Sequence, residues 1–405
     1  MHTPTNRRLL SIGYKLTTGL FVCVVSLFCA PGAMAQEPKP DTTPPDSREY
    51  YFFNPEEFGS NAFCNPLQYA IEGGAPGGRD FSTFEFRKAT KELYVELTNP
   101  IDALNKYGWG KFFYREFTPH IGEGGNWVPN YLWHLVGGGF RTRQLEEYYH
   151  YHGYKHPRLY AWMAMYSMHL WNELSQVEQF MDLSEDKQFG DAENNTVDAL
   201  ADLLFFDWVG KVIFSYDPVA DFAANTLHLR EWSYQSQFNP ATNSFINNGQ
   251  VYWMRYEVMK PVSISFLTST PISSLGLSYE VKPKHHFSVG IGQNAKAIDR
   301  DDNGELVAGA IVYNFGAYYS VDDIPVVVFS YSPRDQIALD RFADDYDRYK
   351  KYTEVIHLNV YPGLVDINGA KPGIAFAFLR ETVFIGITNG RWPAGVIFGS
   401  ERRPN

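Results

Sequence analysis

The stretch "HHFSVGIGQ", residues 285–293, alternates large apolar side chains with small or polar ones. The two alternating sets are Phe287, Val289 and Ile291 against Ser288, Gly290 and Gly292. Successive side chains of a β-strand point to opposite faces of its sheet, so the stretch predicts a strand with one apolar face and one small or polar face. Such a strand is expected where one face contacts lipid and the other faces a lumen.

The same period of two recurs from about residue 250 to the C-terminus. It is seen in QVYWMRYEV, VSISFLTST, SLGLSYEV, VAGAIVYNFGAYYSV, IPVVVFSYS, VIHLNVYPG, PGIAFAFLRE, TVFIGITNG and AGVIFGS. Short connections such as Asp322-Asp323 predict hairpins, and therefore an antiparallel meander. The Asn-Gly pair within residues 299–305 predicts another hairpin turn rather than a calcium loop, because Ala310 replaces the bidentate glutamate of such a loop. About eight to ten strands fit this length, which predicts an outer-membrane β-barrel over residues 216–405.

The N-terminus has the three parts of a secretory signal peptide. Arg7, Arg8 and Lys15 precede the apolar run TTGLFVCVVSLFCAPG, and AMAQ offers a cleavage site after Ala35. The apolar run is shorter than the roughly 20 residues that span a bilayer. We therefore predict a cleaved signal peptide over residues 1–35, followed by a proline-rich, disordered linker over residues 36–50.

Cleavage would leave Cys64 as the one cysteine, so the secreted chain would fold without an internal disulfide. The formal charge would change from −11 to −14, because three basic residues leave and no acidic one does. This negative charge argues against nucleic acid as a partner. Aromatic residues make up 16% of the chain and charged residues 20%, a composition that fits an outer-membrane barrel. A soluble periplasmic protein with a large aromatic core is the alternative.

Residues 127–215 contain three helical patterns. The first runs from Pro129 to His152 and ends before Gly153, the second starts at Pro157 and runs to Phe180, and the third is TVDALADLLFFDWVGKVIF. None has the uninterrupted apolar length of a transmembrane helix. Residues 51–126 give a mixed signal that fits either helices or short strands. The predicted fold class is therefore α+β, with a three-helix segment before the barrel.

Each predicted helix carries polar residues at helical spacing within an apolar stripe. They are Asn130, His134 and Arg141 on the first helix, His169 and Glu173 on the second, and Asp198 and Asp202 on the third. Residues four apart lie on one helix face, so the three sets could converge on one buried polar cluster. The run Gly137–Gly139 costs helix stability, which predicts the close approach of a neighbouring helix or a ligand there.

These residues resemble a known pattern. His134 with a following glycine and arginine, LWNE on the second helix and VDALADLLFFDWVG on the third are similar to the three-helix signature of VanZ-like and YfiM-like proteins. The similar region is residues 126–214, and the helices followed by strands resemble a family of bacterial outer-membrane proteins. The resemblance implies that the polar residues of the three helices meet. It departs from the pattern in two places: Asp202 stands where asparagine is usual, and Asn130 where aspartate is usual. The resemblance implies a site but no defined reaction.

The candidate catalytic residues are therefore His134, Arg141, Glu173, Asp198 and Asp202. In the functional interpretation His134 and Glu173 act as a general acid/base pair, and Arg141 binds an anionic group such as a lipid phosphate. In the structural interpretation the same residues form a hydrogen-bonded network that holds the helices together. No cofactor and no metal ligands are predicted. His150, His152 and His156 make a poor zinc site, because they point to different faces and Gly153 and Pro157 interrupt the helix.

The sequence thus predicts an integral outer-membrane protein of a Gram-negative bacterium with an envelope lipid-related or transport role. A lipid-modifying enzyme and a structural or assembly protein without a ligand are the alternatives. The expected partners are outer-membrane lipids and, during biogenesis, the barrel-assembly machinery. We also predict that His134, Arg141, Glu173 and Asp202 share one hydrogen-bonded network in which a carboxylate of a neighbouring helix pairs with Arg141.

Overall fold

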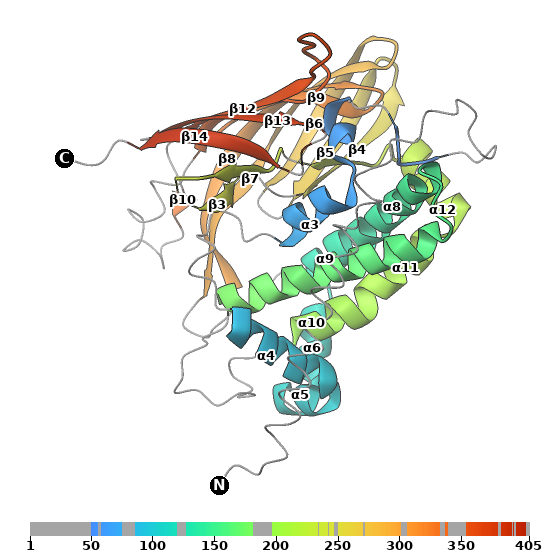
Figure 1. Cartoon of the computed structure of the whole chain (residues 1–405), viewed down its shortest axis with the longest axis vertical. Helices are drawn as coiled ribbons and strands as arrows, with labels where there is room; N and C mark the ends of the chain where they lie inside the picture. The colour runs from blue at the N-terminus through green and yellow to red at the C-terminus, as the bar shows by residue number, and fades with distance from the viewer. Residues whose placement is uncertain are drawn as a thin grey trace.

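In the computed structural model, helices come first along the chain and strands follow. Figure 1 shows the helices below a broad, curved sheet. The structure describes residues 50–55, 58–74, 86–119, 127–180, 197–233, 235–241, 243–246, 250–269, 272–300, 306–332, 337–338, 354–379, 382–390, 392 and 394–401. The predicted signal peptide, nearly all of the predicted linker and most of the charged, helix-competent connection at residues 335–354 lie outside these residues.

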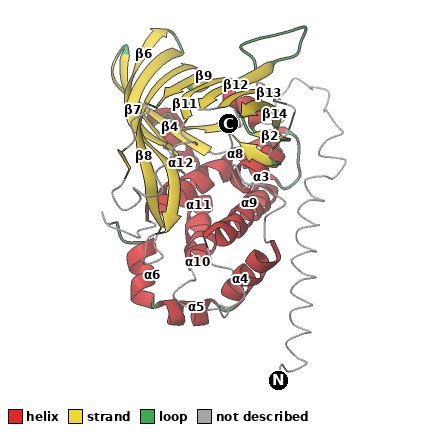
Figure 2. Cartoon of the chain, turned by 90° about the vertical axis from the view of Figure 1, so that its left-hand side faces the viewer, coloured by secondary structure: helices red, strands yellow, loops and turns green. Residues whose placement is uncertain are grey.

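The helices extend beyond the predicted three-helix segment on both sides. They are η1 (Gly59–Phe63), α3 (Pro66–Gly74), α4 (Phe86–Thr98), α5 (Pro100–Tyr107), α6 (Trp109–Glu116), α7 (Trp127–Pro129), η3 (Asn130–Gly138), α8 (Gly139–Tyr151), α9 (Pro157–Phe180), α10 (Asp198–Ala201), η4 (Asp202–Phe206), α11 (Asp207–Phe214), α12 (Asp217–Asp221) and η5 (Phe222–Thr226). Where the structure describes residues 51–126, the mixed signal therefore resolves into helices. Figure 2 places α5 farthest from the sheet, with α3 close to it.

The three predicted helices are present at the predicted places. The first comprises α7, η3 and α8, the second is α9, and the third comprises α10, η4 and α11. Gly153 has a φ of 76° just after the first helix, a left-handed conformation that glycine adopts at little cost. Both η3 and η4 are π-helical, so the first and third helices each contain a widened turn. Among the described residues, no helix combines the length and apolarity needed to cross a membrane.

The strands form one sheet with mostly antiparallel pairing. They are β1 (Arg230–Ser233), β2 (Gln237–Asn239), β3 (Ser244–Ile246), β4 (Gln250–Met259), β5 (Val262–Ser269), β6 (Ile272–Lys282), β7 (His285–Arg300), β8 (Leu306–Val321), β9 (Ile324–Tyr331), β10 (Ile337–Ala338), β11 (Glu354–Val360), β12 (Pro372–Leu379), β13 (Thr382–Asn389) and β14 (Gly395–Glu401). Their order is β1-β4-β5-β6-β7-β8-β9-β11-β12-β13-β14-β2-β3, and β10 pairs with β8.

The predicted antiparallel meander is confirmed, and the predicted closed barrel is not. Ten strands, six from β4 to β9 and four from β11 to β14, pair with their neighbours in chain order. The turn at Asp322-Asp323 joins β8 to β9 with positive φ angles at both residues, as in a type I′ hairpin. However, the sheet has 14 strands among the described residues, because four very short ones add to the meander. The strand pairings run from β1 to β3, and the sheet does not close into a barrel. The region predicted as barrel, residues 216–405, also begins with two helices, α12 and η5, rather than with a strand.

The two faces of the meander differ in the way that the alternation predicts. Leu277 of β6 and Ile291 of β7 point outward and are 56% and 65% exposed, whereas Ser278 and Ser288 between them are each 1% exposed. These two serines face each other on neighbouring strands, and their hydroxyl oxygens lie 2.6 Å apart in a hydrogen bond. On β6 and β7 the large apolar side chains are therefore exposed, and the small polar side chains are buried.

Helices and sheet are joined by a shared apolar core. Phe140 of α8 is buried against Tyr252 of β4, with ring centroids 6.3 Å apart. Phe63 of η1 packs with the next residue of β4, Trp253, and with Tyr361 in a second buried cluster. Tyr252 and Trp253 are consecutive residues of β4 and point to opposite faces of the sheet, so helical segments pack on both faces of this strand.

Glycines allow the three central helices to cross closely, as the run Gly137–Gly139 predicts. A Cβ atom on Gly138 would lie 2.8 Å from Cε1 of His169 on α9. A Cβ atom on Gly139 would lie 2.6 Å from the carbonyl oxygen of Gly210 on α11, and one on Gly210 would collide with the carbonyl oxygen of Leu135. The helix-stability cost of these glycines is thus offset by the packing of α8 and η3 on α9 and α11.

Substitution of Gly210 tests this packing. Gly210→Ala should lower the free energy of unfolding by about 1 to 3 kcal/mol, because the new methyl group meets backbone atoms that cannot move aside. Gly110→Ala in α6 is the matched control, since a Cβ atom there meets nothing within 4 Å. It should be neutral or stabilising by up to about 1 kcal/mol, owing to the higher helix propensity of alanine. Urea or thermal unfolding of the purified variants measures both, and equal effects would argue against the close crossing.

Candidate functional site

A buried carboxylate, Asp207 of α11, joins the first and second central helices. Its Oδ1 lies 3.1 Å from Nδ1 of His134 on η3, and its Oδ2 lies 2.5 Å from Nδ1 of His169 on α9. Asp207 is 0% exposed, and both histidines are buried. The two imidazole rings stand edge to face with centroids 5.1 Å apart. If each histidine donates from Nδ1, both Nε2 atoms are left as acceptors.

The opposite edge of the His134 ring faces two more carboxylates. Nε2 of His134 lies 3.2 Å from Oδ2 of Asp202 on η4. Glu173 of α9 completes this group, and one donor atom from each of the three residues lies within 4.8 Å of the others. Asp202 is 1% exposed and Glu173 is 2% exposed. His134 therefore stands between Asp207 on one edge and the pair of Glu173 and Asp202 on the other.

The surroundings of Glu173 and Asp202 raise the pKa of these residues, whereas those of Asp207 lower its pKa. Burial raises the pKa of Glu173 well above its ordinary value, and repulsion from Asp198 and Asp207 adds to this. The pKa of Asp202 is raised in the same way, by burial and by Asp198 and Glu173. Burial also opposes the ionisation of Asp207, but His169 and the hydrogen bonds from both histidines outweigh it and lower its pKa. Asp207 is thus an anion, while Glu173 and Asp202 favour a bound proton or a bound cation.

The π-helical turns explain how Asp202 and Asp207 reach opposite edges of one ring. In an α-helix, residues four apart share a face, but a π-helical turn brings residues five apart together. Asp202 begins η4 and Asp207 follows directly after it. His134 lies within η3, which is also π-helical. Widened turns of this kind are frequent at functional sites.

Three of the five predicted site residues are brought together: His134, Glu173 and Asp202. Asp198 lies at the start of α10, half-buried, and it acts on Glu173 and Asp202 through electrostatic repulsion. Asn130, which shares a helix with His134, instead donates from Nδ2 to the side chain of Glu116 at 2.9 Å.

The prediction that Arg141 pairs with a carboxylate of a neighbouring helix is wrong. Its guanidinium forms a hydrogen-bonded ion pair with Glu231 of β1 and lies over the ring of Tyr69, 4.2 Å from the centroid. Arg141 is 0% exposed, so the reasoning that it requires a carboxylate partner holds. However, that partner comes from the sheet rather than from a neighbouring helix. Arg141 is therefore a link between helices and sheet.

Sequence reasoning missed the role of Asp207 and left His169 out of the site. His169 precedes Glu173 by four residues, which is a signal that places both on one face of α9. Asp207 gave no such signal, because a spacing of five from Asp202 lies off the shared face of an α-helix. Its location directly after an aromatic pair, in FFDW, is a weaker sign, since a charged residue there must either pair or reach solvent.

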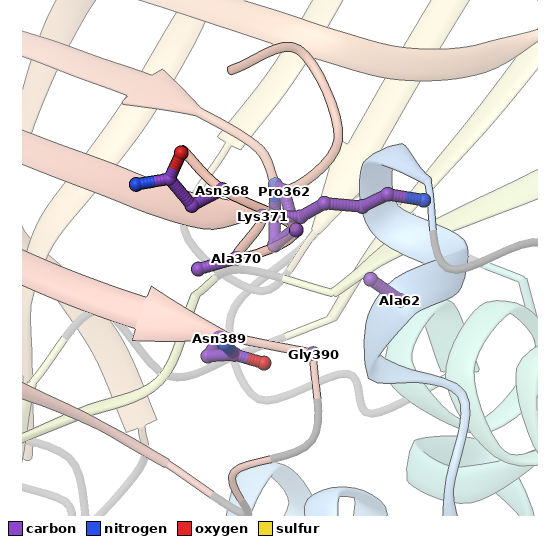
Figure 3. Close-up of a pocket in the computed structure, with 8 residues that line it drawn as sticks. Ala62, Pro362, Asn368, Ala370, Lys371, Asn389 and Gly390 are labelled. Carbon is purple, nitrogen blue, oxygen red and sulfur yellow. The ribbon is translucent and has the colours of Figure 1, made fainter. Parts of the chain in front are cut away.

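Two overlapping groups offer donors of the types that bind metals. They are His134, His169 and Asp207, and His134, Glu173 and Asp202. A separate pocket of about 350 Å³ lies between η1 and the strand ends (Figure 3), and it is lined by Ala62, Pro362, Asn368, Gly369, Ala370, Lys371, Asn389 and Gly390. In Figure 3 the side chain of Lys371 extends toward η1. These residues offer amide groups and one cation but no acid/base pair, so the helical cluster is the stronger candidate.

Comparison of the chain with protein-family models, curated proteins and solved structures gives no match. The resemblance to VanZ-like and YfiM-like proteins stays a prediction.

Replacement of Asp207 tests its role in stability. Asp207→Asn should lower the free energy of unfolding by about 3 kcal/mol at neutral pH, because it removes the anion that both histidines contact. The folded-state pKa of Asp207 is lowered, so this contribution is present above its ordinary value of 3.8 and is lost as the pH falls through the folded-state pKa. The difference between wild type and variant should therefore shrink below pH 3.8.

The control for this experiment is Asp217→Asn. Asp217 also pairs with a basic side chain, Arg143, but is 60% exposed. Its loss should cost no more than about 1 kcal/mol. Chemical unfolding followed by circular dichroism at several pH values measures both variants, and a gap for Asp207→Asn that stays constant down to acid would contradict the assignment.

Proposed function

We propose that the chain is an integral outer-membrane protein of the β-barrel type, whose helices carry a polar site with an envelope lipid-related or transport role. The observation that carries the proposal is the exposed apolar face of the meander. An antiparallel sheet in water buries its apolar face and exposes its polar one. Here Leu277 and Ile291 are exposed while Ser278 and Ser288 are buried. Lipid outside the sheet accounts for this order, because apolar side chains then face an apolar solvent.

Aromatic side chains on the same face support a membrane boundary. The register places Tyr279 of β6, Phe287 of β7 and Tyr319 of β8 beside one another across three strands. Tyr279 and Phe287 are both exposed. Rows of aromatic residues mark the interfaces between lipid and water in outer-membrane barrels. This row lies next to the β6–β7 turn, which would then be close to one membrane surface.

One short segment offers a way to complete the barrel. β1 pairs with β4 at one end of the meander, and β2 pairs with β14 at the other end. These two strands belong to a single stretch, residues 230–239, so one segment carries both edge pairings. Unpaired strand edges do not occur in the hydrocarbon region, which favours closure through this segment in a membrane. The inner side would be occupied in part by η1, whose Phe63 packs against Trp253 and Tyr361.

The third central helix has a second exposed apolar surface. Leu204, Trp208 and Val212 follow one another at steps of four residues and are 48%, 45% and 43% exposed. A stripe of this kind is typical of a helix that contacts lipid or another apolar surface. It supports a location beside the membrane, in addition to the outward face of the sheet.

Charge substitutions at two depths test the lipid contact. Leu277→Arg, in the middle of β6, should destabilise the membrane-embedded protein by about 2 to 4 kcal/mol, whereas Val281→Arg, near the β6–β7 turn, should cost no more than about 1 kcal/mol. Both positions are exposed apolar residues of the same face, at 56% and 52%, which makes them a matched pair. Unfolding in lipid vesicles measures the difference.

Fractionation gives the complementary result. The mature chain should remain in the membrane pellet after a carbonate wash. Release of the protein into the soluble fraction, together with equal effects of the two arginine substitutions, would overturn the membrane proposal and leave the periplasmic alternative.

A lipid-modifying enzyme is the second candidate, and the contacts of His134 favour it. A histidine held by Asp207 on one edge and facing Glu173 and Asp202 on the other has the arrangement of a general acid/base group. Mass spectrometry of envelope lipids should then show the same change in a deletion strain and in a strain with His134→Ala. Unchanged lipids in both strains would leave the binding or structural interpretation.

A further inference from the structure

The Nε2 side of His134 brings together acceptor atoms without a matching donor. If His134 donates its Nδ1 hydrogen to Asp207, its Nε2 atom carries a lone pair. That atom faces Oδ2 of Asp202 at 3.2 Å, with Glu173 completing the group. Within the part of the chain that the structure describes, Oε1 of Glu173 and Oδ1 of Asp202 are also buried and accept no hydrogen bond. Buried polar atoms without a partner are costly, so such a group requires protons or a cation between its members.

The charges around this group favour a cation. The largest electrostatic contributions to Glu173 and Asp202 come from other carboxylates, among them Asp198 and Glu116, and all of them raise the pKa of the two residues. Lys211 of α11 is buried and interacts with Asp207 on the other edge of the His134 ring. A buried set of carboxylates is stable only when charge is neutralised nearby.

We propose that Nε2 of His134, Glu173 and Asp202 bind one divalent transition-metal cation of the class of Zn²⁺ and Mn²⁺. An imidazole nitrogen with two carboxylates is a common ligand set for these ions, whereas Mg²⁺ and Ca²⁺ prefer oxygen ligands throughout. Donor atoms at about 2.0 to 2.2 Å from such an ion are about 3.3 to 4.3 Å apart. In the structure the donor atoms of His134, Glu173 and Asp202 lie within 4.8 Å of one another. Small side-chain rotations would therefore bring them to the spacing that a bound ion requires.

Asp207 acts in this site as a positioning residue. Histidines that bind a metal through one nitrogen usually donate the other to a carboxylate, which fixes the tautomer and the orientation of the ring. The 3.1 Å contact between Nδ1 of His134 and Asp207 is of this kind. The ligands come from three helices, so the ion would join η3, α9 and η4. This site does not depend on whether the outer face of the sheet contacts lipid.

The test is a metal titration of the full mature chain, purified from the cell fraction in which it is found and stripped with a chelator. Zn²⁺ and Mn²⁺ should bind with one ion per chain, and Co²⁺, used as a spectroscopic probe, should give visible absorption bands that Zn²⁺ removes by competition. Mg²⁺ and Ca²⁺ should bind at least tenfold more weakly. The measurement reports binding rather than activity, so it is independent of any reaction.

Variants assign the ion to its ligands. His134→Gln and Asp202→Asn should raise the dissociation constant at least a hundredfold, and Asp207→Asn should raise it about ten- to a hundredfold with the stoichiometry retained. The matched controls are His150→Gln on α8, which lies against Tyr50, and Asp217→Asn, which pairs with Arg143. Both should bind as the wild type does.

Wild-type protein that binds no Zn²⁺, Mn²⁺ or Co²⁺ at stoichiometric level would overturn the proposal, whether or not the variants fold. Binding that persists unchanged in folded His134→Gln or Asp202→Asn would also overturn it, since the ion would then lie elsewhere. Neither result bears on the carbonate wash, so a failure of this site is distinguishable from a failure of the membrane proposal.

Discussion

The arrangement of the helices depends on the burial of Asp207. A carboxylate withdrawn from water is tolerated only when donors surround it, and Asp207 obtains two from His134 and His169. These donors belong to two other helices, so the hydrogen bonds fix the three helices against one another. Gly138 is part of the same constraint, because a Cβ atom there would occupy the space of the His169 ring. Close packing and charge pairing are therefore satisfied together.

The same principle joins the helices to the sheet. Arg141 is buried beside the aromatic ring of Tyr69 and is neutralised by Glu231 of β1. Gly137 precedes Arg141 by four residues, and a Cβ atom on it would collide with the hydroxyl group of Tyr252 on β4. A charge and a glycine on one helix thus set how closely β1 and β4 approach. Because the two links are adjacent, the orientation of the polar cluster and that of the sheet are coupled.

The protein has polar groups on the inside of both its parts. In the sheet they include the hydrogen-bonded Ser278 and Ser288 and the ion pair of Arg255 with Asp323. In the helices they are carboxylates around one imidazole, with Glu173 and Asp202 held under strong electrostatic repulsion. Small hydroxyl groups satisfy each other across strands without cost in charge. The buried carboxylate of Asp323 is neutralised by Arg255, whereas Glu173 and Asp202 face other carboxylates, and this difference is why the helices hold the candidate site.

The sequence by itself determined the periodic elements and part of the site. A period of two identified the meander and its exposed apolar face, and steps of four residues placed His134, Glu173 and Asp202 on the polar faces of their helices. Asp207 escaped this reasoning, because its place beside His134 depends on a π-helical turn in η4, which has no signature in α-helical spacing. The partner of Arg141 escaped it too. A buried arginine requires a carboxylate partner. That this partner is Glu231, 90 residues away in the chain, follows only from the packing of the sheet against the helices. Local spacing sets which side chains share a face, and tertiary packing alone sets which faces meet.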